Sequence, residues 1–298
     1  MDRKKALLNK PLALSEFILN PDGSIYHLNL RPEDIASTII TVGDPDRVED
    51  ISKYFDTIEV KRHRREFKTH TGTYKGKRIT VISTGIGTDN IDIVFNELDA
   101  LVNVDFESRT IKEKLISLDL IRIGTSGAIQ GNIPIDSLLI SEAAIGFDSL
   151  LRFYENVSFL DTDFSEAFMK HTNWSMDKSS PYVVNADDQL IDLFSSERII
   201  KGITATNVGF YGPQGRILRL GLQDSQLNDK IGSFEYKERK VTNLEMETSG
   251  IYGMAKLLGH RAISLNAILA NRANLTFSSK PNETLDKLIQ YTLSCLVA

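Results

Sequence analysis

The fold is decided by a stretch at residues 37–48 that reads STIITVGDPDRV. Its first half is dominated by β-branched residues, which is typical of a buried strand. Gly43 then begins a turn, and the pair Asp44 and Pro45 is typical of the cap and the first residue of a helix. We expect this helix to continue as an amphipathic segment to Phe55. The stretch therefore predicts one strand–turn–helix unit.

The same unit recurs along the chain. We expect strands at residues 78–83, 120–123, 137–145 and 262–269, and helices at residues 89–101, 248–258 and 282–296. Glycine-rich turns are expected at residues 84–88 and 124–128, after two of these strands. Alternating strands and helices predict an α/β fold with a mixed or largely parallel sheet. Ligands of such sheets bind at the carboxyl ends of the strands, where the glycine-rich turns should gather.

The composition excludes several classes of function. The chain has 298 residues, of which 41% are hydrophobic, and 35 basic against 40 acidic residues give a net charge of −5. Nucleic acids and membrane surfaces are anionic, so we do not expect a dedicated binder of either. Cys295 is the one cysteine, which excludes an internal disulfide. No run approaches the roughly 20 apolar residues that span a bilayer, and we expect a cytoplasmic protein.

Two stretches interrupt the pattern of strands and helices. Residues 1–24 precede the first recognisable element and are interpreted as an N-terminal extension. Residues 103–117 are polar and charged, with a helical spacing of Ile111, Leu115 and Leu118, and are interpreted as an insertion. We expect residues 25–298 to form the one domain, with both stretches at its periphery.

Motifs for metal and redox chemistry are absent. The sequence has no HExxH, CxxC or P-loop pattern, and its five histidines show no metal-ligand spacing. Gly85-Ile86-Gly87 lacks the third glycine of a dinucleotide fingerprint. We therefore expect neither a metal site nor a redox cofactor.

Arginines beside glycines are the first candidates for chemistry. Arg47 follows Gly43, and Arg122 lies in an apolar strand just before Gly124. Backbone N–H groups and a planar guanidinium together match an oxyanion such as phosphate. Surface ion pairing would account for either arginine alone, but an arginine inside an apolar strand needs an anionic partner.

Residues 210–216, which read FYGPQGR, are a candidate for binding a planar base. Phe210 could stack on the ring, and Gln214 and Arg216 could form hydrogen bonds with its edge. A loop held by aromatic packing would explain the same residues, and spacing alone does not decide.

Residues 243–247, which read NLEME, are a candidate for binding a sugar. Glu245 and Glu247 can share one face of an extended segment and accept hydrogen bonds from vicinal hydroxyls. Favourable acidic charge at the start of a helix is the alternative.

Taken together, six segments resemble the uridine phosphorylases of the nucleoside phosphorylase family, in its trimeric/hexameric class. They are residues 41–48, 83–87, 121–130, 210–216, 243–248 and 270–272, and they occur in the order typical of that family. The resemblance implies a single-domain, three-layer α/β fold with a central mixed β-sheet flanked by helices. It implies a glycosyltransferase of pyrimidine salvage that uses phosphate to split a pyrimidine nucleoside, uridine above all, into uracil and ribose 1-phosphate. It also implies a homodimer or a homohexamer.

The resemblance further implies roles for individual residues. The phosphate site would consist of Gly43, Arg47, Arg122 and Thr125, with Arg65 from a neighbouring subunit. The ribose site would consist of Glu245, Met246 and Glu247, with His27 from a neighbouring subunit. The base site would consist of Phe210, Gln214 and Arg216. Catalysis would fall to Arg122, Gln214, Arg216 and Glu247.

Phosphate is then a co-substrate, and no cofactor is expected. Thr88-Asp89-Asn90 replaces a usual Gly-Pro-Ser near the place where some relatives hold a monovalent cation. A structural monovalent cation near Glu66 is therefore only an alternative.

Three rival functions stay open at this point: a purine nucleoside phosphorylase, a 5′-methylthioadenosine-type nucleosidase and a non-catalytic nucleoside-binding relative. A purine enzyme would want an acid near the base, whereas residues 269–272 read LANR. A hydrolase would not need the arginine cluster. Intact Arg47, Arg122, Gln214 and Arg216 argue against a loss of activity.

Overall fold

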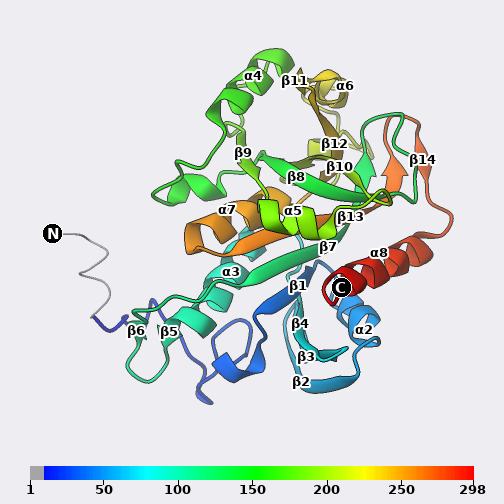
Figure 1. The fold of residues 1–298 in the computed structure, drawn as a ribbon. Coiled ribbons are helices and arrows are strands. Elements are labelled where there is room, and N and C mark those ends of the chain that lie inside the picture. The colour runs from blue at the N-terminus through cyan, green and yellow to red at the C-terminus, as the bar shows by residue number, and fades with distance from the viewer. Residues whose placement is uncertain (1–9) are drawn as a thin grey trace.

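A mixed β-sheet runs through the molecule and carries helices on both sides, as the computed structural model of residues 10–298 shows (Figure 1). The strands of this sheet are β1 (Thr38–Val42), β2 (Thr57–Arg64), β3 (Phe67–Tyr74), β4 (Lys77–Ser83), β7 (Asp119–Ala128), β8 (Leu138–Gly146), β9 (Tyr182–Asn185), β10 (Ile200–Thr206), β11 (Glu235–Tyr236), β12 (Arg239–Glu245), β13 (Arg261–Asn271) and β14 (Thr276–Phe277). The α-helices are α2 (Asp46–Ser52), α3 (Thr88–Asn103), α4 (Thr162–Thr172), α5 (Asp188–Phe194), α6 (Leu227–Ser233), α7 (Thr248–Leu258) and α8 (Pro281–Cys295). Three-residue and four-residue 3-10 helices are η1 (Pro32–Asp34), η2 (Leu150–Phe153) and η3 (Gly212–Gln214).

The sheet closes on itself at one end. Its strands follow the order β11-β12-β10-β8-β13-β7-β1-β4-β3-β2, and β12 pairs a second time, with β7. Strands β7, β12, β10, β8 and β13 therefore form a closed ring, which removes two free sheet edges. The neighbouring part of the sheet is open, with β1 parallel to both β4 and β7, and β2, β3 and β4 antiparallel.

Helices cover this sheet in the way that the α/β pattern predicts. Figure 1 shows α3 and α7 on one side of β7 and β13, and α2 and α8 on the other. The predicted helix at residues 248–258 matches α7, and it ends at Gly259, whose left-handed conformation (φ 79°) suits a residue without a Cβ atom. The α/β fold predicted from the sequence is confirmed.

The predicted turn at residues 124–128 is wrong, because β7 continues through Gly124 to Ala128 and pairs with β13 throughout. A glycine is needed at position 124 for another reason. A Cβ atom at Gly124 would lie 1.8 Å from Nη1 of Arg122, whose side chain folds back over this position. The missing side chain makes room for a buried arginine and does not end the strand.

Two smaller expectations also need correction. Helix α2 begins at Asp46, one residue after the predicted Pro45, although the Asp44 carboxylate does accept a hydrogen bond from the Asp46 backbone N–H. The predicted helical spacing at residues 103–117 is wrong, because the segment forms a hairpin of β5 (Val104–Asp105) and β6 (Thr110–Ile111). Ile111 pairs with Val104 across this hairpin, so the apolar residue belongs to a cross-strand pair and not to a helix face.

The described part of the N-terminal extension, residues 10–24, is held by this hairpin. The Arg109 guanidinium donates hydrogen bonds to the backbone carbonyls of Leu12, Ala13 and Phe17, and it lies over the Phe17 ring. Phe17 also packs edge-on against Phe106 of the hairpin. The predicted extension at residues 1–9 lies outside the described residues.

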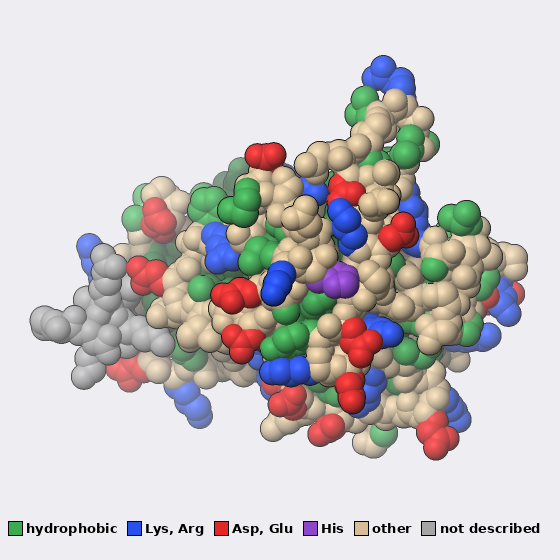
Figure 2. All heavy atoms as spheres, turned by 90° about the horizontal axis from the view of Figure 1, so that it is seen from above, with side chains coloured by type: hydrophobic (Ala, Val, Ile, Leu, Met, Phe, Trp, Pro, Cys, Tyr) green, Lys and Arg blue, Asp and Glu red, His purple; other side chains and the backbone are tan. Residues whose placement is uncertain are grey.

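No helix in residues 10–298 is long and apolar enough to span a bilayer. Figure 2 looks down on the face that carries α4 and α6, and shows acidic and basic side chains interspersed over it.

Candidate active site

A cavity of about 760 Å³ opens where β1, β4 and β12 end. It receives Gly43 after β1, Gly85 after β4, Thr125 from β7 and Met246 after β12. A volume of this size suits a small-molecule ligand of nucleoside size. The glycine-rich turn after β4 reaches this edge of the sheet as predicted, and Gly85 (φ 71°) and Gly87 (φ 99°) both adopt backbone conformations that favour glycine.

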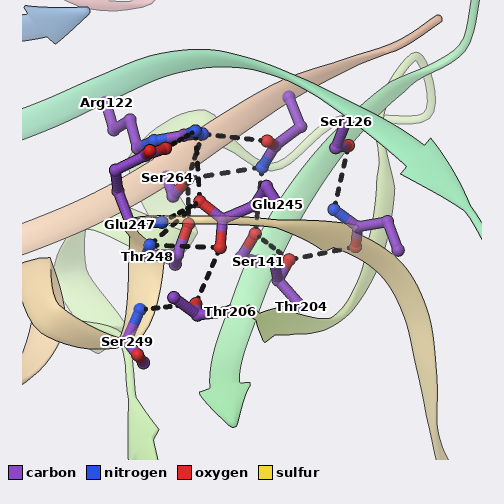
Figure 3. A network of polar contacts seen from close by, with 12 residues as sticks. Arg122, Ser126, Ser141, Thr204, Thr206, Glu245, Glu247, Thr248, Ser249 and Ser264 are labelled. Atoms are coloured by element: carbon purple, nitrogen blue, oxygen red, sulfur yellow. Dashed lines mark hydrogen bonds and ion pairs between the residues drawn. The ribbon is translucent and has the colours of Figure 1, made fainter. Parts of the chain in front are cut away.

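Arg122 lies at the floor of this cavity and is only 6% exposed. Its Nη2 donates to Glu247 Oε2 at 2.6 Å and lies 3.1 Å from Glu245 Oε2, as Figure 3 shows. Its Nη1 donates to Asn266 Oδ1 at 3.0 Å. Burial alone would lower the pKa of Arg122, but the two carboxylates outweigh burial and raise it. The charge of Arg122 is therefore compensated within the protein.

Glu245 fixes the start of α7. Its carboxylate accepts hydrogen bonds from the backbone N–H groups of Glu247 and Thr248 and from the Thr206 hydroxyl (Figure 3). A carboxylate at a helix N-terminus satisfies N–H groups that have no partner inside the helix. This arrangement matches the alternative expected for this residue, acidic charge at a helix start, although Glu245 also lines the cavity.

Glu247 lines the cavity from the position just before α7, where it is the N-cap residue. Its Oε1 accepts a hydrogen bond from the Gly87 backbone N–H at 2.9 Å, and its Oε2 accepts the bond from Arg122. Burial raises the pKa of Glu247, Glu245 adds to the rise, and Arg122 opposes it. Glu247 thus joins the turn after β4 to the floor of the cavity.

Arg47 lies beside Arg122 on the cavity wall but lacks a comparable partner. Its Nε is buried without a hydrogen-bond partner, and its guanidinium forms no ion pair within residues 10–298. Burial lowers the pKa of Arg47, and the charge of Arg122 lowers it further. The carboxylates of Asp44, Asp50 and Glu247 oppose this shift without pairing with Arg47, so its guanidinium is available to bind an anion.

The opposite end of the cavity holds three side chains of the 210–216 segment. Arg216 Nη1 donates to Gln214 Oε1 at 2.7 Å and to the Phe210 carbonyl at 2.7 Å. Its guanidinium carbon lies 3.8 Å from the centre of the Phe210 ring. Gln214 is 3% exposed, and its Nε2 makes no hydrogen bond to any described residue. This end therefore offers an aromatic face, an amide and a guanidinium to a planar polar ring.

Arg272 supports this end from outside the cavity lining. Its Nη2 donates to the Gly215 carbonyl at 3.3 Å, and its Nε is buried without a partner among the described residues. Burial lowers the pKa of Arg216, and the charge of Arg272 lowers it further. Positive charge therefore accumulates where the edge of a bound ring would lie.

His27 and Arg65, the two residues expected to serve a neighbouring subunit, lie outside this cavity lining. Arg65 is exposed at the turn between β2 and β3, with φ 53°, whereas its neighbour Glu66 does line the cavity. His27 is half-buried in the loop before β1. The other predicted residues all line the cavity: Gly43, Arg47, Arg122, Thr125, Phe210, Gln214, Arg216, Glu245, Met246 and Glu247.

Sequence reasoning missed several residues of the lining. Ile86 and Asn90 enter from the turn after β4 and from α3, and Phe277 enters from β14. Phe277 is 67% exposed, an unusual state for a phenylalanine that nothing in its local sequence indicates. The segment 88–90 was noted only as a departure from a pattern, yet Asn90 faces the cavity.

Within residues 10–298, no three histidine, cysteine, aspartate or glutamate side chains come together as metal ligands do.

Comparisons with known proteins agree with this geometry. A sequence model described as the phosphorylase superfamily matches residues 37–292. The chain is 32% identical to a uridine phosphorylase of Thermococcus kodakarensis over 260 residues, which cover 86% of this chain and 80% of that protein. It is 26% identical to a DeoD-type purine nucleoside phosphorylase of Listeria monocytogenes, over 80% of this chain and 84% of the relative. Among solved structures it is similar to a Trypanosoma brucei nucleoside phosphorylase described as showing uridine phosphorylase activity, with a TM-score of 0.84, 29% identity, and coverage of 94% of this chain and 99% of that one.

Proposed function

The chain belongs to the phosphorylase superfamily, and on that premise we propose that it splits uridine with inorganic phosphate into uracil and ribose 1-phosphate. One observation carries the proposal. Arg47, whose Nε is buried without a hydrogen-bond partner and which forms no ion pair within residues 10–298, shares a single cavity with the Gln214–Arg216 pair. The first can bind an anion, and the second fits the edge of a planar base that has both carbonyl and N–H groups.

Phosphate is the anion that we assign to the arginine end. Arg47 supplies a charge that has no ion-pair partner among the described residues, and Gly43, Thr125 and Arg122 line the same cavity. The guanidinium fork of an arginine matches two phosphate oxygens at once. Because both ligands would share one cavity, the phosphate would lie next to the anomeric carbon of the sugar.

The reaction is a displacement at that carbon. An oxygen of the phosphate forms a bond to C1′ while the bond from C1′ to N1 of uracil breaks, and the electron pair of that bond goes to the base. The sugar passes through an oxocarbenium-like state, which the phosphate dianion stabilises. The released uracil anion takes its proton from water.

Gln214 and Arg216 stabilise the leaving base. Nε2 of Gln214 and the guanidinium of Arg216 can donate to a carbonyl oxygen on which negative charge grows. Phe210 offers its ring to the face of the base. Donors that are held in place before the reaction need no reorganisation when the charge develops.

Glu247 and Met246 bind the ribose in this proposal. The Glu247 carboxylate is held by Gly87 and Arg122 and lines the cavity between the two ends. Glu245 contributes less directly, because backbone N–H groups of α7 occupy its oxygens. It holds the start of α7 and therefore the position of Glu247.

A second subunit completes the site in this proposal. His27 and Arg65 lie off the cavity lining of their own chain, and Tyr26, the residue before His27, lies under Arg64, the residue before Arg65, at 5.2 Å. The two candidates are thus neighbours on one surface, as residues that enter one partner site together must be. We propose a homodimer or homohexamer in which residues 25–298 form the catalytic domain.

A purine substrate fits the base end less well. The described segments 210–216 and 269–272 contain no carboxylate, and Asn271 donates to the backbone carbonyls of Gln130 and Ile133. Protonation of a purine leaving group would therefore lack an acid from this segment.

An assay of purified protein with four nucleosides tests the proposal. Uridine, thymidine, inosine and 5′-methylthioadenosine are each incubated with phosphate, and the free base is measured. We expect release of uracil from uridine at a rate that exceeds release from both purine nucleosides. Preferred cleavage of inosine or 5′-methylthioadenosine, or no release from any substrate, contradicts it.

A further inference from the structure

The loop that carries His27 is anchored to one carboxylate, that of Glu97 in the middle of α3. His27 Nδ1 lies 2.6 Å from Glu97 Oε1, and the His27 backbone N–H lies 3.0 Å from both oxygens of Glu97. The Leu28 backbone N–H donates to Oε2 at 2.9 Å. Three donors from two consecutive residues therefore converge on a single side chain.

This arrangement fixes the imidazole chemically as well as spatially. A carboxylate can only accept, so the neutral ring must carry its proton on Nδ1. Nε2 then becomes an acceptor with no hydrogen bond to any described residue, on a side chain that is 26% exposed. A carboxylate that orients a histidine in this way also makes its other nitrogen a better acceptor.

The same loop is joined to the turn that carries Arg65. The Asn20 side-chain amide donates to the carbonyls of Ile25 and Tyr26, and its oxygen accepts from Arg64 Nη1 at 2.6 Å. Arg64 lies over the Tyr26 ring, which packs edge-on against His27. The loop is therefore held from two sides, by Glu97 and by Asn20.

We propose that Glu97 is a positioning residue that fixes His27 as a hydrogen-bond acceptor for the 5′-hydroxyl of the nucleoside in the neighbouring subunit. The inference rests on the proposed function. A sugar hydroxyl is a donor, so it needs a free acceptor, and Nε2 is the one that this geometry presents. Helix α3 also lines its own cavity through Asn90, so one rigid element would support two sites.

A pair of substrates separates this role from general support of the fold. Uridine carries the 5′-hydroxyl, and 5′-deoxyuridine lacks it. We expect Glu97→Gln to lower kcat/KM for uridine by about tenfold, the loss of one hydrogen bond. The loss of kcat/KM should be seen with uridine and not with 5′-deoxyuridine. His27→Ala should lower kcat/KM for uridine at least as much, and the double variant with Glu97→Gln should be no worse than His27→Ala alone.

Glu113→Gln is the matched control, because Glu113 is an exposed glutamate in the segment after β6. It should leave both substrates unchanged. An equal loss of kcat/KM on both substrates in Glu97→Gln, or no loss on uridine, overturns the inference. If the unmodified protein does not cleave uridine at all, it is the proposed function that fails.

A second measurement does not depend on activity. Imidazole nitrogen shifts in the intact protein, assigned to His27 by difference from His27→Ala, report which ring nitrogen carries the proton. We expect the Nδ1–H form in the unmodified protein and a mixture of both forms in Glu97→Gln. A dominant Nε2–H form in the unmodified protein contradicts the inference whatever the kinetics show.

Discussion

Two arginines, the buried Arg122 and the partly buried Arg47, face the same cavity in different electrostatic states. Arg122, on the closed ring of strands, is paired with Glu245 and Glu247, and their charge raises its pKa. Arg47, on the helix after the open strand β1, has a buried Nε without a partner and a lowered pKa. The charge of Arg122, on the ring, is therefore already neutralised by two glutamates. The charge of Arg47, beside the open part of the sheet, is free to pair with a bound anion.

The difference separates stability from binding. Removing one partner of a buried ion pair leaves the other charge uncompensated, whereas removing a cation that has no ion-pair partner leaves no such charge behind. We therefore expect substitution of Arg122 to lower the free energy of unfolding, and substitution of Arg47 to weaken phosphate binding.

The largest effect is expected for Arg122→Met. Glu245 and Glu247 would lose their common partner, and we expect a loss of about 3–5 kcal/mol in the free energy of unfolding. Urea denaturation measures it. A stability within experimental error of the unmodified protein would mean that the pairing with the two glutamates is not what holds the ring.

Arg47→Met is the matched variant on the other side of the comparison. We expect kcat/KM for phosphate to fall on the order of 10²–10³-fold, as for loss of one transition-state donor, while unfolding free energy stays equal or rises. Kinetics at varied phosphate and the same urea titration measure both. A variant that is destabilised as much as Arg122→Met would erase the distinction.

Gly124→Ala sharpens the comparison from the ring side. A Cβ atom would collide with Nη1 of Arg122, and moving the guanidinium would strain its ion pairs. We expect a destabilisation of about 1–3 kcal/mol, typical of overpacking in a core. Gly221→Ala is the matched control, because a Cβ atom there meets no neighbour within 4 Å and the backbone is not left-handed. Equal losses in both variants would argue against the collision.

The smallest effect concerns the pH dependence of uridine binding without phosphate. Because the pKa of Glu247 is raised, its carboxylate gains a proton at a higher pH than an exposed glutamate does. Uridine affinity should therefore weaken as the pH falls through that raised value, and Glu247→Gln should bind weakly at every pH. Calorimetric titration over a range of pH checks this, and the same decline in the glutamine variant would assign the effect to another group.

The sequence predicted those elements that depend on interactions between residues close together in the chain. The strand at residues 37–42, the turn at residues 84–88 and the helix ended by Gly259 follow from β-branched runs, glycine and capping. The turn at Gly124 is a wrong prediction because the cause of the glycine is the Arg122 side chain, two residues earlier on the same face of β7, and the sequence does not show that this side chain folds back over Gly124. The hairpin at residues 104–111 was missed because Ile111 pairs with Val104, a contact that helical spacing does not reveal.

The sequence predicted many of the described residues that line the candidate cavity, but not how their charges are paired. Ten expected residues line the cavity, yet only the three-dimensional arrangement distinguishes the paired Arg122 from the unpaired Arg47. Glu97 gave no signal, because it lies on an ordinary helix 70 residues from His27. Long-range pairing of this kind depends on tertiary structure.

The most direct test of the account is the phosphate dependence of uridine cleavage. Uracil and ribose 1-phosphate are measured from uridine at zero and at saturating phosphate. We predict equimolar amounts of both products with phosphate and no uracil above background without it. Uracil released at the same rate in the absence of phosphate, with free ribose as the second product, would contradict it.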